Sequence, residues 1–198
     1  MTTDRIGRRR LLALGGAAAA SALAVPASAQ QFTGEIERER PAQGVRRNTQ
    51  SFRSVRWQDH FPSLANGAIL ADVASRAMHY WSADGSIYRC YPCSVPMTEE
   101  FTRRGRTRIV EKRYKPTWIP TPNMRRRDPS LPAVVPPGPE NPLGTRAMNL
   151  SWTYYRIHGI DNPAKIGRRA SNGCFGLYNH HAEELYEWAR IGTQVVVI

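Results

Sequence analysis

The pattern of hydrophobic and polar positions changes near residue 66. Between residues 30 and 65 the chain is polar, rich in arginine and only weakly periodic, as in Glu35–Pro41. A segment of this composition buries too little apolar surface to fold by itself. We therefore expect a flexible lead-in over residues 30–65, with one short helix near its end, and a folded domain over residues 66–198.

Short apolar runs bounded by turn residues fill much of this second region. Such runs are typical of β-strands, and they predict strands at residues 68–73, 77–81, 87–95, 107–114, 147–150, 153–158 and 194–198. The Ala-Asp-Gly-Ser sequence at residues 83–86 predicts a hairpin turn, because Asp-Gly tolerates the positive φ that tight hairpins require. The pattern therefore favours a single, mainly β domain without internal repeats.

A proline-rich segment interrupts the strands. Most prolines of the chain lie in residues 115–144. Proline lacks an amide donor and fixes φ, so this segment cannot form a central strand. A loop of this length in a compact domain is usually functional. We expect a lid over a cleft, with one helical turn at residues 122–127.

One helix is clearly marked near the C-terminus. Asn179 is the expected N-cap. Acidic residues in the first turns, a basic residue in the last turn and a following glycine are the other helix signals: Glu183, Glu184, Arg190 and Gly192. Its predicted apolar face consists of Ala182, Leu185, Trp188 and Ala189.

The first 29 residues have the pattern of an export signal. Adjacent arginines at residues 8–10 precede an Ala-rich apolar run from Leu11 to Val25, and small residues at 27–29 suit a signal peptidase. Arginines followed by leucines favour the twin-arginine route, although an ordinary secretory signal is similar. The run is too short and too rich in Ala and Gly for a good transmembrane helix, and no later stretch is apolar enough to span a bilayer. We expect a periplasmic protein that loses residues 1–29.

The positive charge limits the choice of partner. The whole chain carries a net charge of +12, and removal of residues 1–29 takes away four arginines and one aspartate, which leaves +9. This sign favours an anionic partner such as nucleic acid, acidic lipid or a carboxylate-bearing polymer. Export disfavours nucleic acid, and the basic residues are not interleaved with aromatic residues as in a single-strand binding face. The oligomeric state stays open.

All three cysteines lie in the mature chain, at Cys90, Cys93 and Cys174. An odd number in an oxidising compartment leaves at least one thiol outside any internal disulfide. Cys90 and Cys93 lie in a predicted strand, where residues three apart point to opposite faces, although Pro92 could bend the chain enough to join them. We leave that disulfide open and favour two small buried hydrophobic side chains. A single C-x-x-C supplies too few ligands for a metal site.

We assign no role to His79, His180 or His181. His79 lies in a predicted strand and is expected to be half-exposed. His180 and His181 open the predicted helix, where adjacent side chains point about a quarter turn apart and do not suit a shared metal ion.

Two short stretches place reactive side chains beside glycine. Residues 156–159 (Arg-Ile-His-Gly) end a predicted strand with His158, and residues 171–174 (Ser-Asn-Gly-Cys) place Cys174 in a tight turn. A thiol needs a neighbouring base or positive charge to become a thiolate at neutral pH, and histidine is the usual base. Glycine lets backbone amides approach a reacting carbonyl, as an oxyanion hole requires.

These stretches predict Cys174 as a nucleophile and His158 as its base. Three cations between them in the sequence would attract an anionic substrate if they lie near the turn: Lys165, Arg168 and Arg169. The alternative is an inert core cysteine and a histidine that merely ends a strand. Against it, Ser-Asn-Gly makes a poor core strand and a good exposed turn.

The two stretches belong to a longer pattern that resembles the L,D-transpeptidase (YkuD-type) catalytic domain. The pattern runs through His158-Gly159, Pro163, Ile166-Gly167, Ser171-x-Gly173-Cys174, Asn179, Leu185-Tyr186 and Gly192-Thr193-x-Val195. Gly67-x-Ile69 through Tyr91-Pro92 resembles the first strands of that domain. Its middle loop is similar to Trp118-x-Pro120-Thr121-Pro122-x-Met124 and Asn141-Pro142-Leu143-Gly144. The resemblance covers residues 66–198, and the order His…Ser-x-Gly-Cys is more specific than any single motif.

The resemblance implies a YkuD-like β-sandwich or barrel with one C-terminal helix and a long Pro-rich loop. It also implies action on peptidoglycan stem peptides. Cys174 would attack the carbonyl of the third stem residue, a diaminoacid, and release the terminal D-alanine. The amine of a second stem would then resolve the thioester into a crosslink between two diaminoacids, and another amine or water is the alternative acceptor.

The same resemblance implies roles for the neighbours of this pair. The Gly159 carbonyl would orient His158, and Ser171 would fix the turn or contact substrate. Backbone amides would line the oxyanion hole, namely those of Asn172, Gly173 and Cys174. The implied chemistry needs no metal or organic cofactor.

Two positions depart from the family pattern. Related sequences generally carry Arg or Asn two residues after the cysteine, where this chain has Gly176, and often an acidic residue where it has His181. Loss of a polar side chain beside the nucleophile could weaken substrate positioning, alter specificity or mark a degenerate enzyme. Three hypotheses follow: a transpeptidase, a carboxypeptidase or hydrolase of the same bonds, and a catalytically degenerate wall-binding module.

Overall fold

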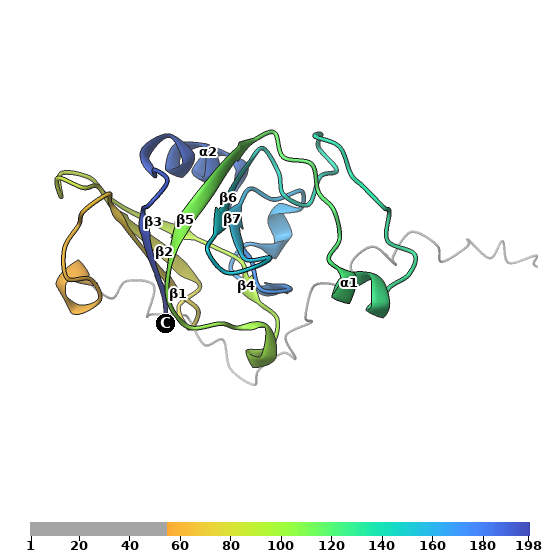
Figure 1. Cartoon of the computed structure of the whole chain (residues 1–198), viewed down its shortest axis with the longest axis horizontal. Helices are drawn as coiled ribbons and strands as arrows, with labels where there is room; N and C mark the ends of the chain where they lie inside the picture. The colour runs from red at the N-terminus through yellow and green to blue at the C-terminus, as the bar shows by residue number, and fades with distance from the viewer. Residues whose placement is uncertain (1–54) are drawn as a thin grey trace, which may run out of the picture. The chain divides into compact units, whose positions relative to one another are not determined.

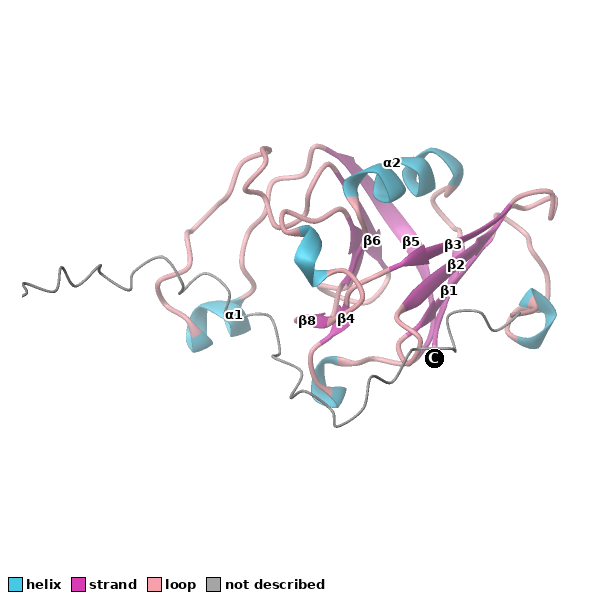
Figure 2. Ribbon diagram, turned by 180° about the vertical axis from the view of Figure 1, so that it is seen from behind, coloured by secondary structure: helices cyan, strands magenta, loops and turns pink. Residues whose placement is uncertain are grey.

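The computed structural model describes residues 55–198. In this part of the chain an eight-stranded sheet has the strand order β3-β2-β1-β10-β5-β6-β7-β9, and a short parallel pair has the order β4-β8. The sheet is curled (Figures 1 and 2). The strands are β1 (Ala68–Asp72), β2 (Ala77–Trp81), β3 (Tyr88–Pro92), β4 (Val95–Pro96), β5 (Gly105–Tyr114), β6 (Arg146–Leu150), β7 (Arg156–His158), β8 (Arg169–Ser171), β9 (Phe175–Gly176) and β10 (Gln194–Val197). The α-helices are α1 (Pro122–Arg127) and α2 (Asn179–Trp188). The prediction of a mainly β domain with one principal helix is confirmed.

Strand β1 separates two cores. It pairs in parallel with β10 and antiparallel with β2, and its side chains alternate between the two faces of the sheet. Ile69 and Ala71 enter the main core, whereas Ala68 and Leu70 enter a second, smaller cluster. Because both faces are covered, the strand appears in the sequence as a continuous apolar run.

Residues 55–65 cover the second face of β1. Phe61 and Leu64 are buried in the same cluster as Leu70, after one turn of 3₁₀ helix at Trp57–Asp59. The short helix expected near the end of the lead-in is therefore present, but this part of the predicted flexible segment packs on the domain. The reason is that the apolar outer face of β1 needs a partner. Residues 30–54 and the predicted export signal lie outside the described residues.

Helix α2 covers β6 and β7 (Figure 2). The predicted apolar face is buried at Ala182, Leu185 and Ala189. The N-cap is Tyr178, which makes no side-chain capping bond. The prediction of Asn179 as N-cap is wrong because its amide binds two other backbone segments, described below. No helix within residues 55–198 has the length and apolar character to cross a membrane.

Two predicted strands are shorter than their apolar runs. The run at 87–95 divides into β3 and β4, because Pro92 cannot continue the ladder and Ser94 bridges to Gly176 instead. The run at 153–158 forms a strand only from Arg156, because Tyr154 adopts a φ of 69°. The hairpin at 83–86 forms as predicted, with Gly85 at a φ of 73°.

The predictions for His79 and Cys90 are wrong. His79 is only 3% exposed, because it stacks on Trp81 in the interior strand β2, and its Nδ1 lies 2.8 Å from Tyr88 Oη. Cys90 is exposed because β3 is an edge strand. Cys93 is buried as predicted, and no disulfide joins it to Cys90.

The proline-rich segment has a small core of its own. Trp118, Met124 and Leu143 are buried together. The predicted helical turn is α1, and Thr121 caps it by accepting a hydrogen bond from the Met124 amide. Because prolines donate no amide hydrogen, a side chain supplies part of the bonding: the Asn141 amide donates to the carbonyls of Pro116, Val135 and Pro136.

Candidate active site

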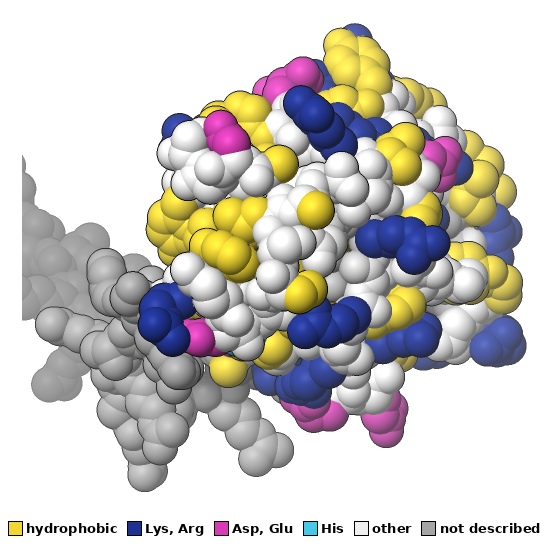
Figure 3. Space-filling model, turned by 60° about the vertical axis from the view of Figure 1, so that its left-hand side comes forward, with side chains coloured by type: hydrophobic (Ala, Val, Ile, Leu, Met, Phe, Trp, Pro, Cys, Tyr) yellow, Lys and Arg dark blue, Asp and Glu magenta, His cyan; other side chains and the backbone are white. Residues whose placement is uncertain are grey.

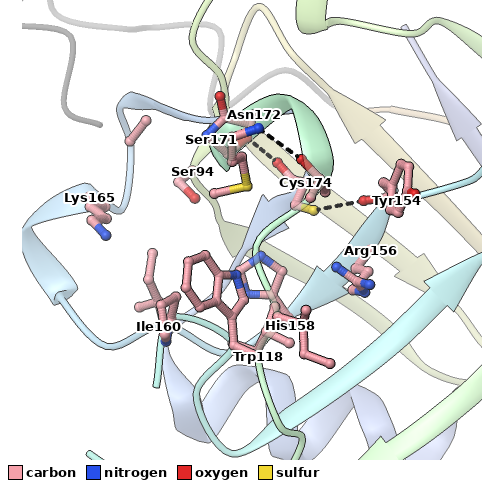
Figure 4. A pocket seen from close by; sticks show the side chains of 16 residues that line it. Ser94, Trp118, Tyr154, Arg156, His158, Ile160, Lys165, Ser171, Asn172 and Cys174 are labelled. Carbon is pink, nitrogen blue, oxygen red and sulfur yellow. Dashed lines mark hydrogen bonds between the residues drawn. The ribbon is translucent and has the colours of Figure 1, made fainter. Parts of the chain in front are cut away.

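One cavity brings the predicted reactive residues together. Cys174 and His158 both line it, and Figure 4 shows their side chains on facing walls. The proline-rich segment contributes mainly apolar lining: Trp118, Ile119, Thr121, Met124, Pro142 and Leu143. The rest of the domain contributes Ser94, Tyr154, Arg156, Ile160, Lys165, Ala170, Ser171 and Asn172. The segment expected to be a lid therefore forms one wall of the cavity.

His158 is the last residue of β7 and is buried, with 8% exposed. Its Nδ1 forms a short hydrogen bond with the Gly159 carbonyl, which is the contact expected of that carbonyl. A carbonyl can only accept, so Nδ1 carries the proton, and Nε2 of the neutral ring keeps its lone pair. The backbone thus selects the tautomer that can accept a proton at Nε2.

Burial lowers the pKa of His158 from 6.5 to about 4. Loss of water around the charged ring is the largest cause. The hydrogen bond to the Gly159 carbonyl opposes it, and the positive charges of Arg156 and Lys165 lower the pKa further. The imidazole is therefore neutral at neutral pH and able to take up a proton.

Cys174 ends a tight turn between β8 and β9. The Ser171 hydroxyl donates to the Cys174 carbonyl at 2.6 Å and accepts from the Gly173 amide at 3.4 Å, so this serine fixes the turn. Gly173 has a φ of 120°, and a Cβ there would lie 3.1 Å from the Tyr155 ring. Only glycine fits this position. The cysteine is half-buried at the cavity wall.

The Cys174 thiol donates a hydrogen bond to the Tyr154 carbonyl at 3.3 Å. Tyr154 has a φ of 69°, which is rare for a bulky residue. Strained residues of this kind gather at functional sites. The sequence predicts a strand over residues 153–158 and not this turn, so the contact could not be expected from it.

Asn179 joins two backbone segments behind His158. Its Oδ1 accepts from the amides of Thr145 and Ile160, at 3.2 and 3.1 Å, and its Nδ2 donates to the Ile160 carbonyl at 3.1 Å. A Cβ on either neighbouring glycine would lie about 2 Å from this Oδ1, at 2.1 Å for Gly144 and 2.2 Å for Gly159. Because these two glycines have no side chain, there is room for the Asn179 amide, which holds the backbone around the Gly159 carbonyl.

Of the three predicted substrate cations, only Lys165 lines the cavity. It pairs with Asp161 at 3.3 Å. Arg168 is exposed outside the lining, and Arg169 pairs with Glu99 at 3.5 Å. Figure 3 shows basic side chains distributed over one face among apolar ones.

Gly176 is closely packed by Ser94. The Ser94 hydroxyl accepts from the Gly176 amide at 3.1 Å, and a Cβ on Gly176 would lie 2.5 Å from Ser94 Oγ and 2.9 Å from Ile160 Cδ1. The family pattern has a polar side chain at this position. In this chain the position is a glycine, and the side chain of Ser94, which lines the cavity, occupies the space beside it. An arginine introduced at Gly176 alone would collide with it.

Arg127 connects the proline-rich segment to the turn of Cys174. Its guanidinium forms a short hydrogen bond with Asn172 Oδ1 and lies over the Phe101 ring, 4.9 Å from the centroid. Asn172, predicted for the oxyanion turn, therefore also contacts the segment that forms the opposite wall.

Sequence reasoning missed several residues of this site. For Arg156 a signal was available, because residues two apart in a strand share a face and His158 follows it by two. For Asn179 the signal was indirect, in the glycines at 144 and 159. Trp118 is part of the stretch that resembles the middle loop of the family but received no role there, and nothing local marked Ser94. Within residues 55–198 no group of three or more His, Cys, Asp or Glu side chains is placed to hold a metal ion.

The curled sheet and the shared cavity define a β-rich domain with a cysteine and a histidine at one site. Residues 66–197 match the model of the YkuD family, the L,D-transpeptidase catalytic domain. The chain therefore belongs to this family.

Two relatives at the level of sequence support this assignment. ORF 5 of the ATP synthase subunits region of Fuscovulum blasticum, assigned by its name to the L,D-transpeptidases, is 47% identical over 197 residues, which cover 99% of this chain and 100% of that protein. ErfK/SrfK of Escherichia coli (strain K12), likewise assigned, is 35% identical over 142 residues, which cover 69% of this chain and 46% of that protein. The chain thus matches about half the length of that second relative.

Solved structures share the fold. L,D-transpeptidase 3 of Mycobacterium tuberculosis matches with a TM-score of 0.51 at 16% identity, covering 67% of this chain and 61% of that chain. The C442S mutant of the Enterococcus faecium L,D-transpeptidase matches with a TM-score of 0.50 at 20% identity, covering 67% of this chain and 49% of that chain. The predicted YkuD-like fold is confirmed.

Proposed function

We propose that this protein is a peptidoglycan L,D-transpeptidase that acts through an acyl-enzyme on Cys174. The observation that carries the proposal is the shared cavity, in which Cys174 faces a neutral His158 whose Nδ1 is anchored on the Gly159 carbonyl. The substrates are stem tetrapeptides of the cell wall. The products are crosslinks between two diaminoacids, or walls that carry another attached amine.

In the first half-reaction, Cys174 Sγ attacks the carbonyl of the third stem residue. The thiol proton passes to His158 Nε2 as the sulfur–carbon bond forms. The carbon–nitrogen bond to the terminal D-alanine then breaks, and the imidazolium returns the proton to the leaving amine. A thioester on Cys174 remains.

In the second half-reaction, an amine of another stem attacks the thioester. His158 takes a proton from that amine and returns it to the departing sulfur, so the thiol is regenerated. If water attacks in place of the amine, the same intermediate gives a shortened stem. A hydrolase or carboxypeptidase is therefore an alternative outcome of the same chemistry.

The lowered pKa of His158 favours proton transfer during the attack over a thiolate–imidazolium pair formed in advance. A neutral imidazole beside a protonated thiol avoids a pair of separated charges, which is costly in a buried site. The Tyr154 carbonyl holds the thiol in place until substrate arrives.

The oxyanion hole is assigned to the turn before the nucleophile. The amides of Asn172, Gly173 and Cys174 lie at its positions in the family pattern. The Gly173 amide has a long bond of 3.4 Å to Ser171 Oγ, and a developing oxyanion is a stronger acceptor than a hydroxyl.

Export places this chemistry at the wall. The proposal includes a signal over residues 1–29, removed on passage to the periplasm by the twin-arginine route, and a lead-in that continues to residue 54. The basic mature chain then meets an anionic polymer whose stems carry carboxylates.

The test uses the purified mature protein and muropeptide tetrapeptides, followed by intact mass. We expect an acyl adduct and a crosslinked dimer with wild type, and neither with Cys174→Ala. A hydrolysed tripeptide alone would identify the hydrolase. Absence of adduct and product, with binding to wall sacculi retained, would identify a degenerate wall-binding module. An adduct that persists in Cys174→Ala would remove Cys174 as the nucleophile.

A further inference from the structure

Arg156 lies on the cavity wall beside the reactive pair. It is the first residue of β7 and His158 is the last, so the two side chains share one face of the strand. Ile157 between them is fully buried in the main core. Figure 4 shows Arg156 next to Cys174, on the side of Tyr154, with Lys165 across the cavity.

A row of polar side chains holds the guanidinium in place. Glu111, Asn149 and Arg156 are direct cross-strand neighbours on β5, β6 and β7. Arg156 Nε donates to Asn149 Oδ1 at 2.9 Å, and Asn149 Nδ2 donates to Glu111 Oε2 at 2.5 Å. Neighbours of this kind are the stabilising unit of a sheet. The row fixes Arg156 through one nitrogen only.

The two terminal nitrogens of Arg156 make no hydrogen bond or ion pair with any residue in the 55–198 part of the chain. Lys165, the other cation of the cavity, is already paired with Asp161. None of the described residues that line the cavity is acidic. Apart from its electrostatic interaction with Glu111 at the other end of this row, Arg156 therefore has no acidic partner in the cavity lining, and its guanidinium is held in a fixed orientation.

We propose that Arg156 binds a carboxylate of the donor stem peptide, adjacent to the carbonyl that Cys174 attacks. The planar fork of a guanidinium matches a carboxylate through two parallel hydrogen bonds. The inference rests on the proposed function, and it names the chemical group that the cavity recognises. Two carboxylates lie within one residue of the scissile carbonyl: the C-terminal one of the departing residue and the one on the diaminoacid side chain.

The experiment compares three synthetic tetrapeptides with the mature full chain. One has both carboxylates free, one has its C-terminus as an amide, and one has its side-chain carboxylate as an amide. We expect wild-type kcat/KM to fall about 10- to 100-fold for one of the amides, mainly through KM. Arg156→Gln should show the same loss on the free acid and no further loss on that amide, which identifies the bound carboxylate.

Two variants sharpen the result. Arg156→Lys keeps the charge without the fork, so it should recover only part of the loss. Arg106→Gln removes the same charge from an exposed position on β5 outside the cavity lining and should leave all three substrates unchanged. Equal losses in Arg106→Gln and Arg156→Gln, or a loss in Arg156→Gln of the same factor on all three peptides, would overturn the proposal.

Peptide binding to Cys174→Ala separates this inference from the proposed function, because it needs no turnover. If wild type reacts with no peptide, the transpeptidase proposal fails. The carboxylate site is then supported when Cys174→Ala binds the free acid and the Cys174→Ala/Arg156→Gln double variant does not. Equal binding by both proteins overturns it.

Discussion

His158 and Cys174 line one cavity but are held by two different kinds of structure. His158 ends a strand inside the sheet, and its ring is fixed by a backbone carbonyl. Cys174 ends a turn that depends on side chains, namely the Ser171 hydroxyl and the neighbouring Asn172 with its contact to Arg127. The base is therefore held by backbone and by the part-buried Asn179 amide within the fold, whereas the nucleophile is held by side-chain contacts nearer the surface.

The largest effect is expected from His158→Gln, which removes the base. The acylation rate should fall by about 10²- to 10⁴-fold, as for loss of a general base. Because the pKa of His158 is lowered to about 4, the acid limb of the wild-type pH–rate profile should lie well below pH 6.5. An acid limb at pH 6.5 or above would contradict the buried, neutral ring.

The same variant tests the energetic cost of that burial. Between pH 6.5 and about 4 the unfolded chain binds a proton at His158 and the folded chain does not. The free energy of unfolding therefore falls by about 3 kcal/mol as the pH is lowered through this window. His158→Gln should remove this part of the slope in urea unfolding at pH 7.5 and pH 4. Burial also lowers the pKa values of His79 and His181, so part of the slope remains in both proteins. Equal slopes would contradict the prediction.

A smaller effect is expected from Asn179→Ala, which weakens the support of the His158 side. Two amides and one carbonyl lose their partner, so the free energy of unfolding should fall by about 2–3 kcal/mol. The Gly159 carbonyl should then hold the imidazole less well, and kcat should fall about 10-fold with KM little changed.

Asn179→Asp is the matched control, because it keeps an acceptor oxygen for both amides. It should retain more of the stability than Asn179→Ala does. A loss of activity that only follows the fraction of unfolded protein would show that Asn179 supports the fold and does not position the base.

The difference between the two regions also explains what the sequence could predict. The strands, the hairpin and α2 follow from local periodicity, and Cys174 and His158 follow from reactive side chains beside glycine. The Tyr154 carbonyl, the Asn179 amide and the Ser94–Gly176 contact join segments far apart in sequence, and no local pattern carries them. The burial of His79 could not be predicted, because the pattern of a single strand does not reveal how many strands flank it.

The smallest effect is expected on the side of Cys174, from Arg127→Gln. The contact with Asn172 is exposed, and exposed polar contacts contribute on the order of 0.5–1 kcal/mol, so kcat/KM should fall only about 2- to 5-fold. If Arg127 joins the proline-rich wall to the turn, its loss should also speed alkylation of Cys174 by iodoacetamide. Arg126→Gln is the control, because Arg126 lies beside it on α1 and bonds to Asn123 instead. If both variants alkylate at the wild-type rate, the turn holds its shape without the wall, and the nucleophile is as firmly placed by the fold as the base is.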